Sequence, residues 1–335
     1  MAAILPVERG AAKLKVLVPD DYGDRVRHLE CVKRFADFDL QVVPGPIRHA
    51  GELVRLLADT DALVLIRERT YIGPELLDAA PRLKIISQLG RVRRNLSIAE
   101  CTQRGIAVAE GPTVSHGTAE LAWALIMAAR RFVPQETAAL RQGAWQSTMG
   151  YMLRGQTLGI WGYGRVGRIL AAYGRAFGMR VLAWGRAQSL AGAQADGFAT
   201  AASRDELFAA SDILSVHVRL LPETAGMITE RDLLRMKPTA LFLNTARAEL
   251  LAPGALVNAL GKGRPGYAAV DVFETEPVEG GDHPLLRMGN VICMPHMGYV
   301  NWQEYETLFG EAFDNIAGFF AGKPKDIANP EVLAR

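Results

Sequence analysis

The segment TLGIWGYGRVG, residues 157–167, joins a short apolar strand to a Gly-x-Gly-x-x-Gly pattern that opens a helical stretch. A dinucleotide-binding turn requires this context. Gly162 permits the tight turn, Gly164 lacks the Cβ that would block a pyrophosphate, and Gly167 lets the helix pack closely on the strand. The helix N-terminus adds amide donors for the phosphates. The alternative is an ordinary glycine turn, which the flanking strand and helix disfavour.

Short apolar runs alternate with longer helical patterns on both sides of this segment, which predicts βαβ units and parallel sheets in an α/β protein. The chain of 335 residues exceeds what one hydrophobic core usually supports, so we expect two domains with a cleft. A helix predicted over 115–131 follows a break at 110–112, and a last helix over 301–320 has no sheet of its own. The predicted strands are 16–18, 40–43, 62–66, 83–86, 106–108, 158–161, 181–184, 213–216, 240–243, 267–270 and 291–294.

The composition argues against several other classes of protein. The net charge is +2 without a run of like charges, which disfavours a nucleic-acid partner. Cys31, Cys101 and Cys293 are odd in number and lack metal-ligand spacing, so neither a disulfide framework nor a metal site is expected. No window reaches the ~18 apolar residues of a membrane span, and the N-terminus lacks the apolar stretch of a signal peptide. We therefore expect a cytoplasmic protein.

The end of the strand predicted after the glycine turn indicates which dinucleotide is bound. An NAD-preferring fold usually offers Asp or Glu about 20 residues after the glycines. This chain has Trp184-Gly185-Arg186 there, with no carboxylate to repel a 2′-phosphate and Arg186 placed to meet one. The sequence therefore favours NADP over NAD. In the alternative interpretation, Arg186 is a solvated loop residue.

Three chemically useful residues each follow an apolar strand in the second half of the chain: Arg247, Glu276 and His296. Open α/β sheets bind their ligands at the carboxyl ends of the strands, so all three are expected to face one crevice. Reduction of a 2-oxo acid needs a cation for the substrate and an acid that protonates the oxygen. A neighbouring carboxylate keeps such a histidine protonated. Taken singly, the three have ordinary alternatives as a surface arginine, a loop acid and a turn histidine.

Four segments together resemble the D-isomer-specific 2-hydroxyacid dehydrogenase family: residues 157–167, NTAR at 244–247, DVFETEP at 271–277 and PHMG at 295–298. The resemblance implies two Rossmann-like domains with a cleft between them. A flavodoxin-like substrate domain would comprise residues 1–111 plus 297–335, and a doubly wound parallel-sheet NAD(P)-binding domain residues 112–296. The implied activity is hydride transfer between NAD(P)H and C2 of a small 2-oxo or 2-hydroxy acid of D configuration.

The resemblance also implies roles for single residues. Arg247, Glu276 and His296 would be catalytic, and Asp271 would hold the nicotinamide carboxamide. The residues expected to bind the cofactor are Gly162, Tyr163, Gly164, Arg165, Val166, Gly167, Trp184, Gly185, Arg186, His217, Val218, Thr224, Thr245, Ala246, Asp271 and Gly298. The residues expected to bind the substrate are Arg67, Leu89, Gly90, Arg91 and Arg247, with backbone amides of the loop 87–91 holding the carboxylate. His217 has an alternative as a core-edge histidine, and Arg67 as a solvated arginine.

Two segments depart from the family pattern. Residues 92–97, VRRNLS, are more basic and bulkier than in many relatives, which leaves the size of the substrate open. Arg219 stands where the family commonly has Pro, and faces either a phosphate or solvent. The apolar helix over 115–131 and the resemblance together predict a homodimer; burial between domains is the alternative for that helix.

Other functions of this fold remain open. Formate dehydrogenase pairs its catalytic histidine with glutamine, so Glu276 argues against it, whereas phosphite dehydrogenase shares the arginine, glutamate and histidine. Some members of the fold are nucleotide-sensing corepressors that bind peptide motifs. A non-redox Rossmann protein such as a methyltransferase is disfavoured by Arg247, Glu276 and His296 together.

Overall fold

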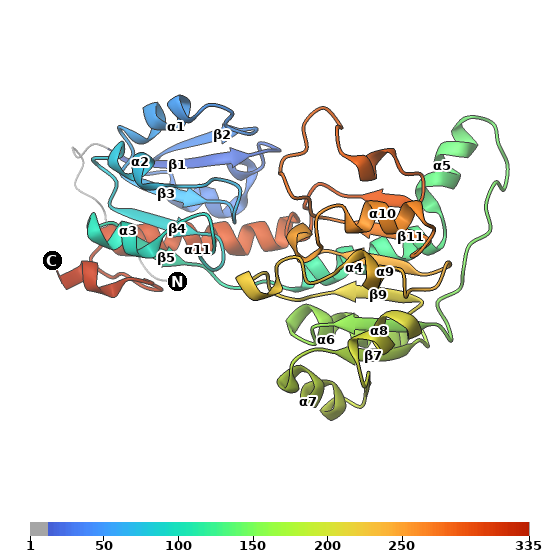
Figure 1. The fold of residues 1–335 in the computed structure, drawn as a ribbon. Coiled ribbons are helices and arrows are strands. Elements are labelled where there is room, and N and C mark those ends of the chain that lie inside the picture. The colour runs from blue at the N-terminus through green and yellow to red at the C-terminus, as the bar shows by residue number, and fades with distance from the viewer. Residues whose placement is uncertain (1–12, 335) are drawn as a thin grey trace. The chain divides into compact units, whose positions relative to one another are not determined.

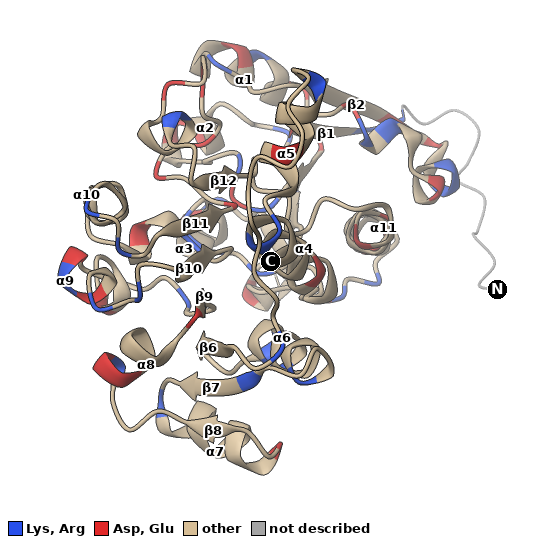
Figure 2. Ribbon diagram, turned by 90° about the vertical axis from the view of Figure 1, so that its right-hand side faces the viewer, with Lys and Arg blue, Asp and Glu red and all other residues tan. Residues whose placement is uncertain are grey.

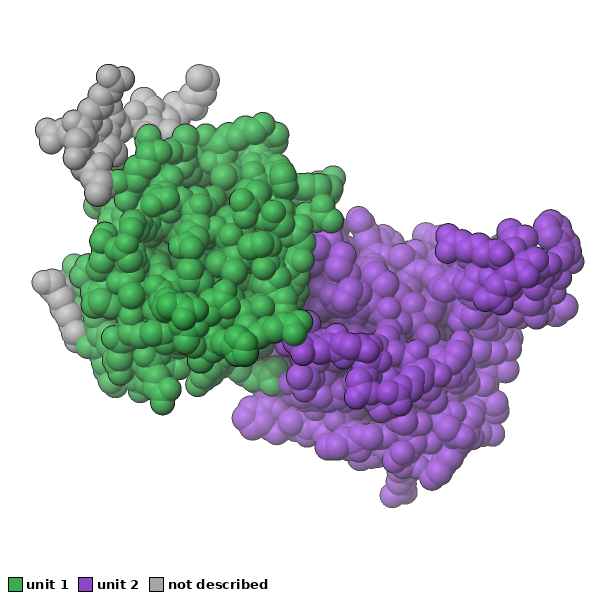
Figure 3. All heavy atoms as spheres, turned by 90° about the horizontal axis from the view of Figure 1, so that it is seen from above, with its two compact units in different colours: residues 1–114, 302–335 green, residues 115–301 purple. Residues whose placement is uncertain are grey.

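The computed structural model describes residues 13–334, which divide into two compact units. Unit 1 joins the chain up to Val114 with the chain from Trp302 onward, and unit 2 is Ser115–Asn301 (Figure 3). The chain therefore leaves unit 1, builds unit 2 and returns. The sequence placed these boundaries at 111/112 and 296/297, and the structure places them at 114/115 and 301/302.

Unit 1 is built on a five-stranded parallel sheet of strand order β2-β1-β3-β4-β5, the flavodoxin-like order. Its last helix, α11, packs against β3, β4 and β5 (Figure 1). The strands are β1 (Leu14–Asp21), β2 (Phe38–Pro44), β3 (Ala62–Leu65), β4 (Ile85–Gln88) and β5 (Ala107–Glu110). The helices are α1 (Ala50–Leu57), α2 (Pro74–Asp78), α3 (Ile98–Gln103) and α11 (Trp302–Phe320), with 3-10 turns η1 (Val26–His28), η2 (Glu30–Phe35) and η6 (Pro330–Ala334).

Unit 2 is built on a seven-stranded parallel sheet of order β12-β11-β10-β9-β6-β7-β8, the doubly wound arrangement of a dinucleotide-binding fold. The strand order reverses between β6 and β9, and ligands of such sheets bind at this switch point. The strands are β6 (Thr157–Trp161), β7 (Arg180–Trp184), β8 (Ala199–Thr200), β9 (Ile213–Val216), β10 (Leu241–Asn244), β11 (Tyr267–Val270) and β12 (Val291–Cys293). The helices are α4 (His116–Arg130), α5 (Val133–Arg141), α6 (Arg165–Ala176), α7 (Ala187–Ala195), α8 (Arg204–Ala210), α9 (Glu230–Leu233) and α10 (Ala255–Gly261). The 3-10 turns are η3 (Pro222–Thr224), η4 (Ala248–Leu250) and η5 (Pro284–Arg287).

The predicted α/β class with two parallel sheets is confirmed, but the sequence misplaced one strand and missed two elements. The strand expected over 83–86 pairs as Ile85–Gln88, because Leu83 is buried in the turn before the strand rather than in the ladder. The short strand β8 and the helix α5 were not predicted. α5 buries none of its residues, so its sequence carries no apolar stripe to detect.

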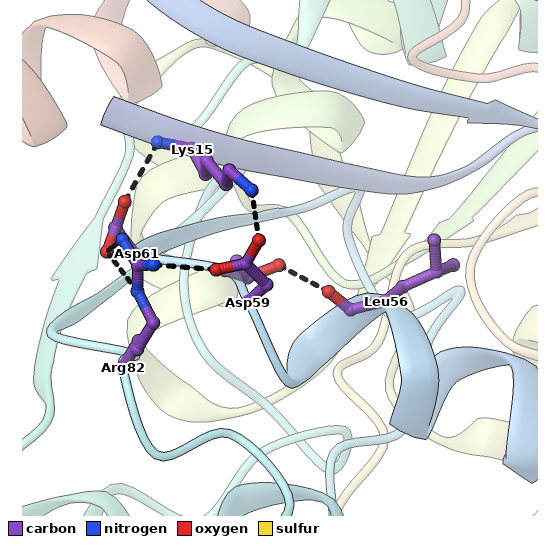
Figure 4. Close-up of polar contacts among 6 residues, drawn as sticks. Lys15, Leu56, Asp59, Asp61 and Arg82 are labelled. Carbon is purple, nitrogen blue, oxygen red and sulfur yellow. Dashed lines mark hydrogen bonds and ion pairs between the residues drawn. The ribbon is translucent and has the colours of Figure 1, made fainter. Parts of the chain in front are cut away.

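A group of charged side chains lies at the amino ends of the strands in unit 1, at the edge opposite the predicted substrate loop (Figure 4). Arg82 bonds both Asp59 at 2.6 Å and Asp61 at 2.8 Å, and Lys15 also pairs with Asp59. Lys15, Asp59 and Arg82 are about half exposed and so are screened by solvent, and their pairs contribute little to the free energy of folding. Figure 2 shows Lys and Arg intermixed with Asp and Glu along the elements.

Within residues 13–334, no helix has the length and apolar character needed to cross a membrane.

Candidate active site

The turn after β6 has the geometry of a pyrophosphate cradle. Gly162 has a φ of +98°, and a Cβ there would lie 2.6 Å from the carbonyl oxygen of His217. A Cβ on Gly167 would lie 2.4 Å from the Gly162 carbonyl oxygen, so helix α6 approaches the turn closely. A Cβ on Gly164, by contrast, would meet no described atom within 4 Å. Gly164 directly precedes α6 and therefore lines open space at its N-terminus, where a phosphate group fits.

Tyr163, between the first two glycines, ties this turn to helix α7. Its ring is buried, and its hydroxyl donates to Asp196 at 2.6 Å, just beyond the end of α7. Burial and the Asp196 carboxylate raise the pKa of Tyr163, so the hydroxyl stays protonated. Arg168 of α6 pairs with the same carboxylate at 3.1 Å. Tyr163 therefore connects the glycine turn to helix α7. Arg165 is exposed and is the first residue of α6.

The end of β7 places Trp184, Gly185 and Arg186 beside the glycine turn. The Gly162 amide donates to the Trp184 carbonyl at 2.8 Å, which fixes the two strand ends together. Arg186 is the exposed residue that precedes α7, and its side chain forms no hydrogen bond or ion pair within the described part of the chain. Its guanidinium is free to meet an anion. Arg219 is exposed as well.

The ends of β9 and β10 supply the remaining predicted cofactor residues. The His217 amide donates to the Trp161 carbonyl at 2.7 Å, and its ring bonds the Ser215 hydroxyl at 2.8 Å. Burial lowers the pKa of His217 to about 4, so the ring is neutral near pH 7. The Thr245 hydroxyl is buried without a hydrogen-bond partner among the described residues. A buried hydroxyl rarely stays unpaired, so this atom fits a bound polar group.

Three other predicted cofactor residues, Thr224, Val218 and Ala246, have structural partners. The Thr224 hydroxyl closes the η3 turn, where it accepts from the Leu221 amide at 2.8 Å and donates to the Arg219 carbonyl at 2.8 Å. Val218 packs half-buried against the core of unit 2, and Ala246 is half-buried. For Thr224 the structure shows a turn-forming role, and contact with the cofactor stays a prediction.

His296 and Glu276 form a hydrogen-bonded ion pair. Nδ1 of His296 lies 2.6 Å from Oε2 of Glu276, and Oε1 of Glu276 accepts from the Phe273 amide at 2.9 Å. Burial raises the pKa of the Glu276 carboxyl, but the hydrogen bond and charge of His296, together with the Phe273 amide and the charge of Arg247, hold the pKa below its usual value. Glu276 is therefore a carboxylate near neutral pH. Its bond at Nδ1 leaves Nε2 of His296 for a substrate.

Asp271 holds the turn that carries His296. Its carboxylate oxygens accept from the Met297 amide at 2.7 Å and from the Gly298 amide at 2.9 Å. His296 itself has a φ of +53°, which an L residue adopts only where its surroundings impose it. Burial raises the pKa of Asp271 to about 6. The structure thus gives Asp271 a supporting role, and its predicted contact with a carboxamide stays untested.

Arg247 lies on the loop after β10, the strand next to β11. The Asn244 side chain fixes this loop, since it donates to the Arg247 carbonyl at 2.9 Å and accepts from the Ala246 amide at 3.0 Å. The charge of Arg247 also lowers the pKa of Glu276, so the structure brings these two residues together. Asn244 was not among the predicted site residues, although a buried asparagine at a strand end was a signal for it.

The predicted substrate loop lies after β4 in unit 1. The Leu89 amide donates to the Leu65 carbonyl at 3.0 Å and the side chain is fully buried, so Leu89 cannot offer its amide to a substrate. For the Leu89 amide the prediction is wrong, because this amide takes part in the pairing with β3, one residue beyond the end of β4 at Gln88. Gly90 has a φ of +79°, and Arg91 pairs with Glu110 at 2.5 Å. For Gly90 and Arg91 the contact with a substrate carboxylate stays a prediction.

The doubly wound sheet and the glycine turn define the class as a dinucleotide-binding α/β protein, and the orphaned Thr245 hydroxyl fits a bound polar group. The profile of the D-isomer specific 2-hydroxyacid dehydrogenase NAD-binding domain matches residues 123–298. A glyoxylate reductase of Thermococcus litoralis is 35% identical over 323 residues, which cover 91% of this chain and 94% of that protein. The chain belongs to the D-isomer-specific 2-hydroxyacid dehydrogenase family.

Two further relatives carry a different substrate name. A D-3-phosphoglycerate dehydrogenase of Mycobacterium bovis is 38% identical over 297 residues, which cover 88% of this chain but only 53% of that protein. A solved structure from Ralstonia solanacearum, provisionally named as a D-3-phosphoglycerate dehydrogenase, is 51% identical with a TM-score of 0.93. That match covers 96% of this chain and 98% of the other. The predicted family and reaction class are therefore confirmed.

Proposed function

We propose that this enzyme interconverts a 2-oxo acid and its D-2-hydroxy acid, with Arg247, Glu276 and His296 as the catalytic residues. The observation that carries the proposal is the 2.6 Å pair of His296 and Glu276, with the charge of Arg247 acting on the same carboxylate. A glutamate that is ionised beside a histidine favours the imidazolium form. This is the form that a carbonyl reduction requires of its acid.

The chain's residues divide the chemistry as follows. When bound, the nicotinamide supplies a hydride to C2 of the oxo acid or accepts one from the hydroxy acid. Arg247 binds the substrate and stabilises the negative charge that develops on its carbonyl oxygen. His296 gives that oxygen the proton from Nε2, becomes neutral, and is protonated again from solvent. His296 keeps its Nδ1 proton throughout and donates it to the Glu276 carboxylate, which fixes the orientation of the ring.

Replacement of the acid tests this mechanism directly. His296→Ala is expected to lower kcat for reduction by about 10²–10⁴-fold with little change in cofactor affinity. His283→Ala is a matched control, because His283 also pairs with a glutamate, Glu274, at 3.1 Å in unit 2. Equal turnover in folded His296→Ala and wild type would refute the assignment. The assay follows nicotinamide absorbance with glyoxylate, hydroxypyruvate, pyruvate and phenylpyruvate.

The same assay distinguishes the other functions of the fold. Phosphite and formate are tested as substrates for oxidation. Turnover of either would contradict the proposed 2-oxo acid activity. Cofactor binding without turnover of any substrate would favour a nucleotide-sensing corepressor.

A cytoplasmic location is proposed on the sequence alone.

We propose NADP as the preferred cofactor, on the basis of Arg186. This exposed arginine directly follows the strand end that contacts Gly162, and no acidic residue stands there. Arg186→Ala is expected to raise KM for NADPH by about tenfold and to leave KM for NADH unchanged, since an arginine–phosphate bond is lost. Equal KM changes for both cofactors would refute this role.

We propose a homodimer whose contact surface is the segment that follows α4 rather than α4 itself. The helix predicted to form the interface, α4, buries Leu125 and Ile126 in unit 2, and its Trp123 packs on Tyr173 and Phe177. The large exposed apolar side chains lie in the following segment, 133–152, which we call the arm and which stands away from the sheet of unit 2 (Figure 1). They are Val133, Leu140, Trp145, Met149 and Met152, with Trp145 78% and Met149 89% exposed. A second copy of the chain would cover these residues.

A further inference from the structure

Arg67, directly beyond β3, has a backbone conformation that its own side chain does not favour. Its φ is +56°, in the left-handed region where L residues other than Asn and Asp are uncommon. Such a residue persists where the surrounding structure imposes the conformation, and residues of this kind gather at functional sites. The sequence already predicted Arg67 as a substrate contact. The question is therefore which groups hold it.

Two buried amide side chains donate to the Arg67 carbonyl. Nε2 of Gln88 lies 2.6 Å from this oxygen and Nδ2 of Asn95 lies 3.0 Å from it. The same Nδ2 is also 3.1 Å from Oε1 of Gln88, so the two amides orient each other. Gln88 is fully buried and Asn95 is 3% exposed. Bonds in such surroundings are strong, and they compensate for the unfavourable backbone conformation.

The conformation directs the Arg67 guanidinium over the predicted carboxylate loop. A Cβ on Gly90 would lie only 2.2 Å from Nη1 of Arg67, so the guanidinium rests where Gly90 leaves room. The amides of Gly90 and Arg91 donate to no described residue. A carboxylate bound by these amides would thus meet the arginine as well, in a charge-assisted contact.

We propose that Gln88 and Asn95 are positioning residues, which hold Arg67 in the conformation that binds the substrate carboxylate. This inference rests on the proposed function, in which Arg67 contacts the substrate. Gln88 and Asn95 would act on the substrate through Arg67, although Nδ2 of Asn95 also lies 3.5 Å from the Thr70 carbonyl oxygen. Their loss should therefore change the affinity for the oxo acid and leave the affinity for the cofactor unchanged.

A double-mutant cycle separates this role from general support of the fold. Arg67→Ala, Asn95→Ala and the double variant are compared with wild type on the oxo acid of the four-substrate panel that wild type reduces best. KM for the acid, KM for the cofactor, kcat and the melting temperature are measured. The matched control is Asn329→Ala, because Asn329 is also a buried asparagine of unit 1 that bonds the backbone, at Val108 and Ile106.

We expect Asn95→Ala to raise KM for the acid about fivefold, the factor that one neutral hydrogen bond contributes. In the Arg67→Ala background the same change should add less than about twofold, because the two act as one unit. Asn329→Ala should lower the melting temperature without changing KM for the acid. Gln88→Met, which keeps the length of the side chain and removes its donor, should repeat the result of Asn95→Ala.

Two outcomes overturn the inference and can be told apart. In the first outcome, Arg67→Ala raises KM for the acid but Asn95→Ala and Gln88→Met do not, or the fold-changes in KM of Arg67→Ala and Asn95→Ala multiply in the double variant. Arg67 would then bind the substrate independently of Gln88 and Asn95. If Arg67→Ala leaves KM unchanged, or wild type reduces none of the four acids, the substrate role of Arg67 fails first and the positioning role fails with it.

Discussion

Gly162 and Gly164 of the phosphate turn are required for different physical reasons, so replacing each with alanine should change stability and cofactor affinity differently. At Gly162 the backbone has a φ of +98° and a Cβ would lie 2.6 Å from the His217 carbonyl oxygen. At Gly164 the φ is −100° and a Cβ would meet no described atom within 4 Å. The first glycine is therefore required by the fold, and the second only by a ligand.

The magnitudes follow from these contacts. For Gly162→Ala, a disfavoured φ costs about 1–3 kcal/mol and displacement of the carbonyl about 1–3 kcal/mol, so we expect a loss of about 2–5 kcal/mol in the free energy of unfolding. Gly164→Ala removes freedom from the unfolded chain without a clash. We expect its free energy of unfolding to stay within about 1 kcal/mol of wild type or to rise slightly. Its new methyl group points into the pyrophosphate space and should weaken cofactor binding by about tenfold or more.

Urea unfolding gives the stability of each variant, and a tryptophan-fluorescence titration with NADPH and NADH gives the affinity. The reasoning predicts that stability and affinity separate: Gly162→Ala is unstable, and Gly164→Ala is stable but binds weakly. Wild-type affinity in Gly164→Ala would show that the pyrophosphate does not approach this glycine. A loss of stability in Gly164→Ala equal to that of Gly162→Ala would show that the open space is filled in the folded protein.

Three further changes have defined outcomes. Folding raises the pKa of Asp271 from 3.8 to about 6, so the folded chain holds this proton more tightly than the unfolded chain. The protonated group therefore contributes to the free energy of unfolding at low pH, and that contribution is lost as the pH rises from about 4 to about 6. Asp271→Asn should flatten the dependence in urea unfolding between about pH 4 and 7, and an unchanged slope would contradict the raised pKa. Glu276→Gln should lower kcat for reduction by about tenfold or more, because a neutral amide no longer holds the His296 ring through a charge-assisted bond at Nδ1; unchanged kcat in the folded variant would refute the pairing. Trp145→Glu should convert a dimer to a monomer in sedimentation velocity, and an unchanged sedimentation coefficient would place the interface elsewhere.

The sequence predicted well the features that depend on local pattern. The glycine spacing depends on one turn, and alternating apolar runs identify parallel strands, so the fold class and the residues at the strand ends could be read from the chain. Arg247, Glu276 and His296 follow adjacent strands of one sheet, which is why residues far apart in sequence were expected to meet.

The features that the sequence did not show depend on contacts between distant segments. Gln88 and Asn95 resemble any polar residues of a loop until the fold brings both amides to the Arg67 carbonyl. The Leu89 amide was assigned to a substrate because nothing in the sequence shows that the pairing of β3 and β4 reaches it. The arm was missed because its apolar side chains face outward, and a pattern that detects burial within one chain cannot identify them.

The order of the units along the chain has a consequence for synthesis on the ribosome. Helix α11 is made after all of unit 2, yet it contributes buried Leu308, Phe309, Phe313 and Ile316 to unit 1, and Phe313 packs on Phe35 at 5.4 Å between ring centroids. The apolar face of the unit 1 sheet that α11 covers therefore stays exposed while all of unit 2 is translated. Unit 2 is continuous in sequence and can fold during that interval. Chaperones that shield apolar surface would act on the N-terminal sheet until α11 emerges.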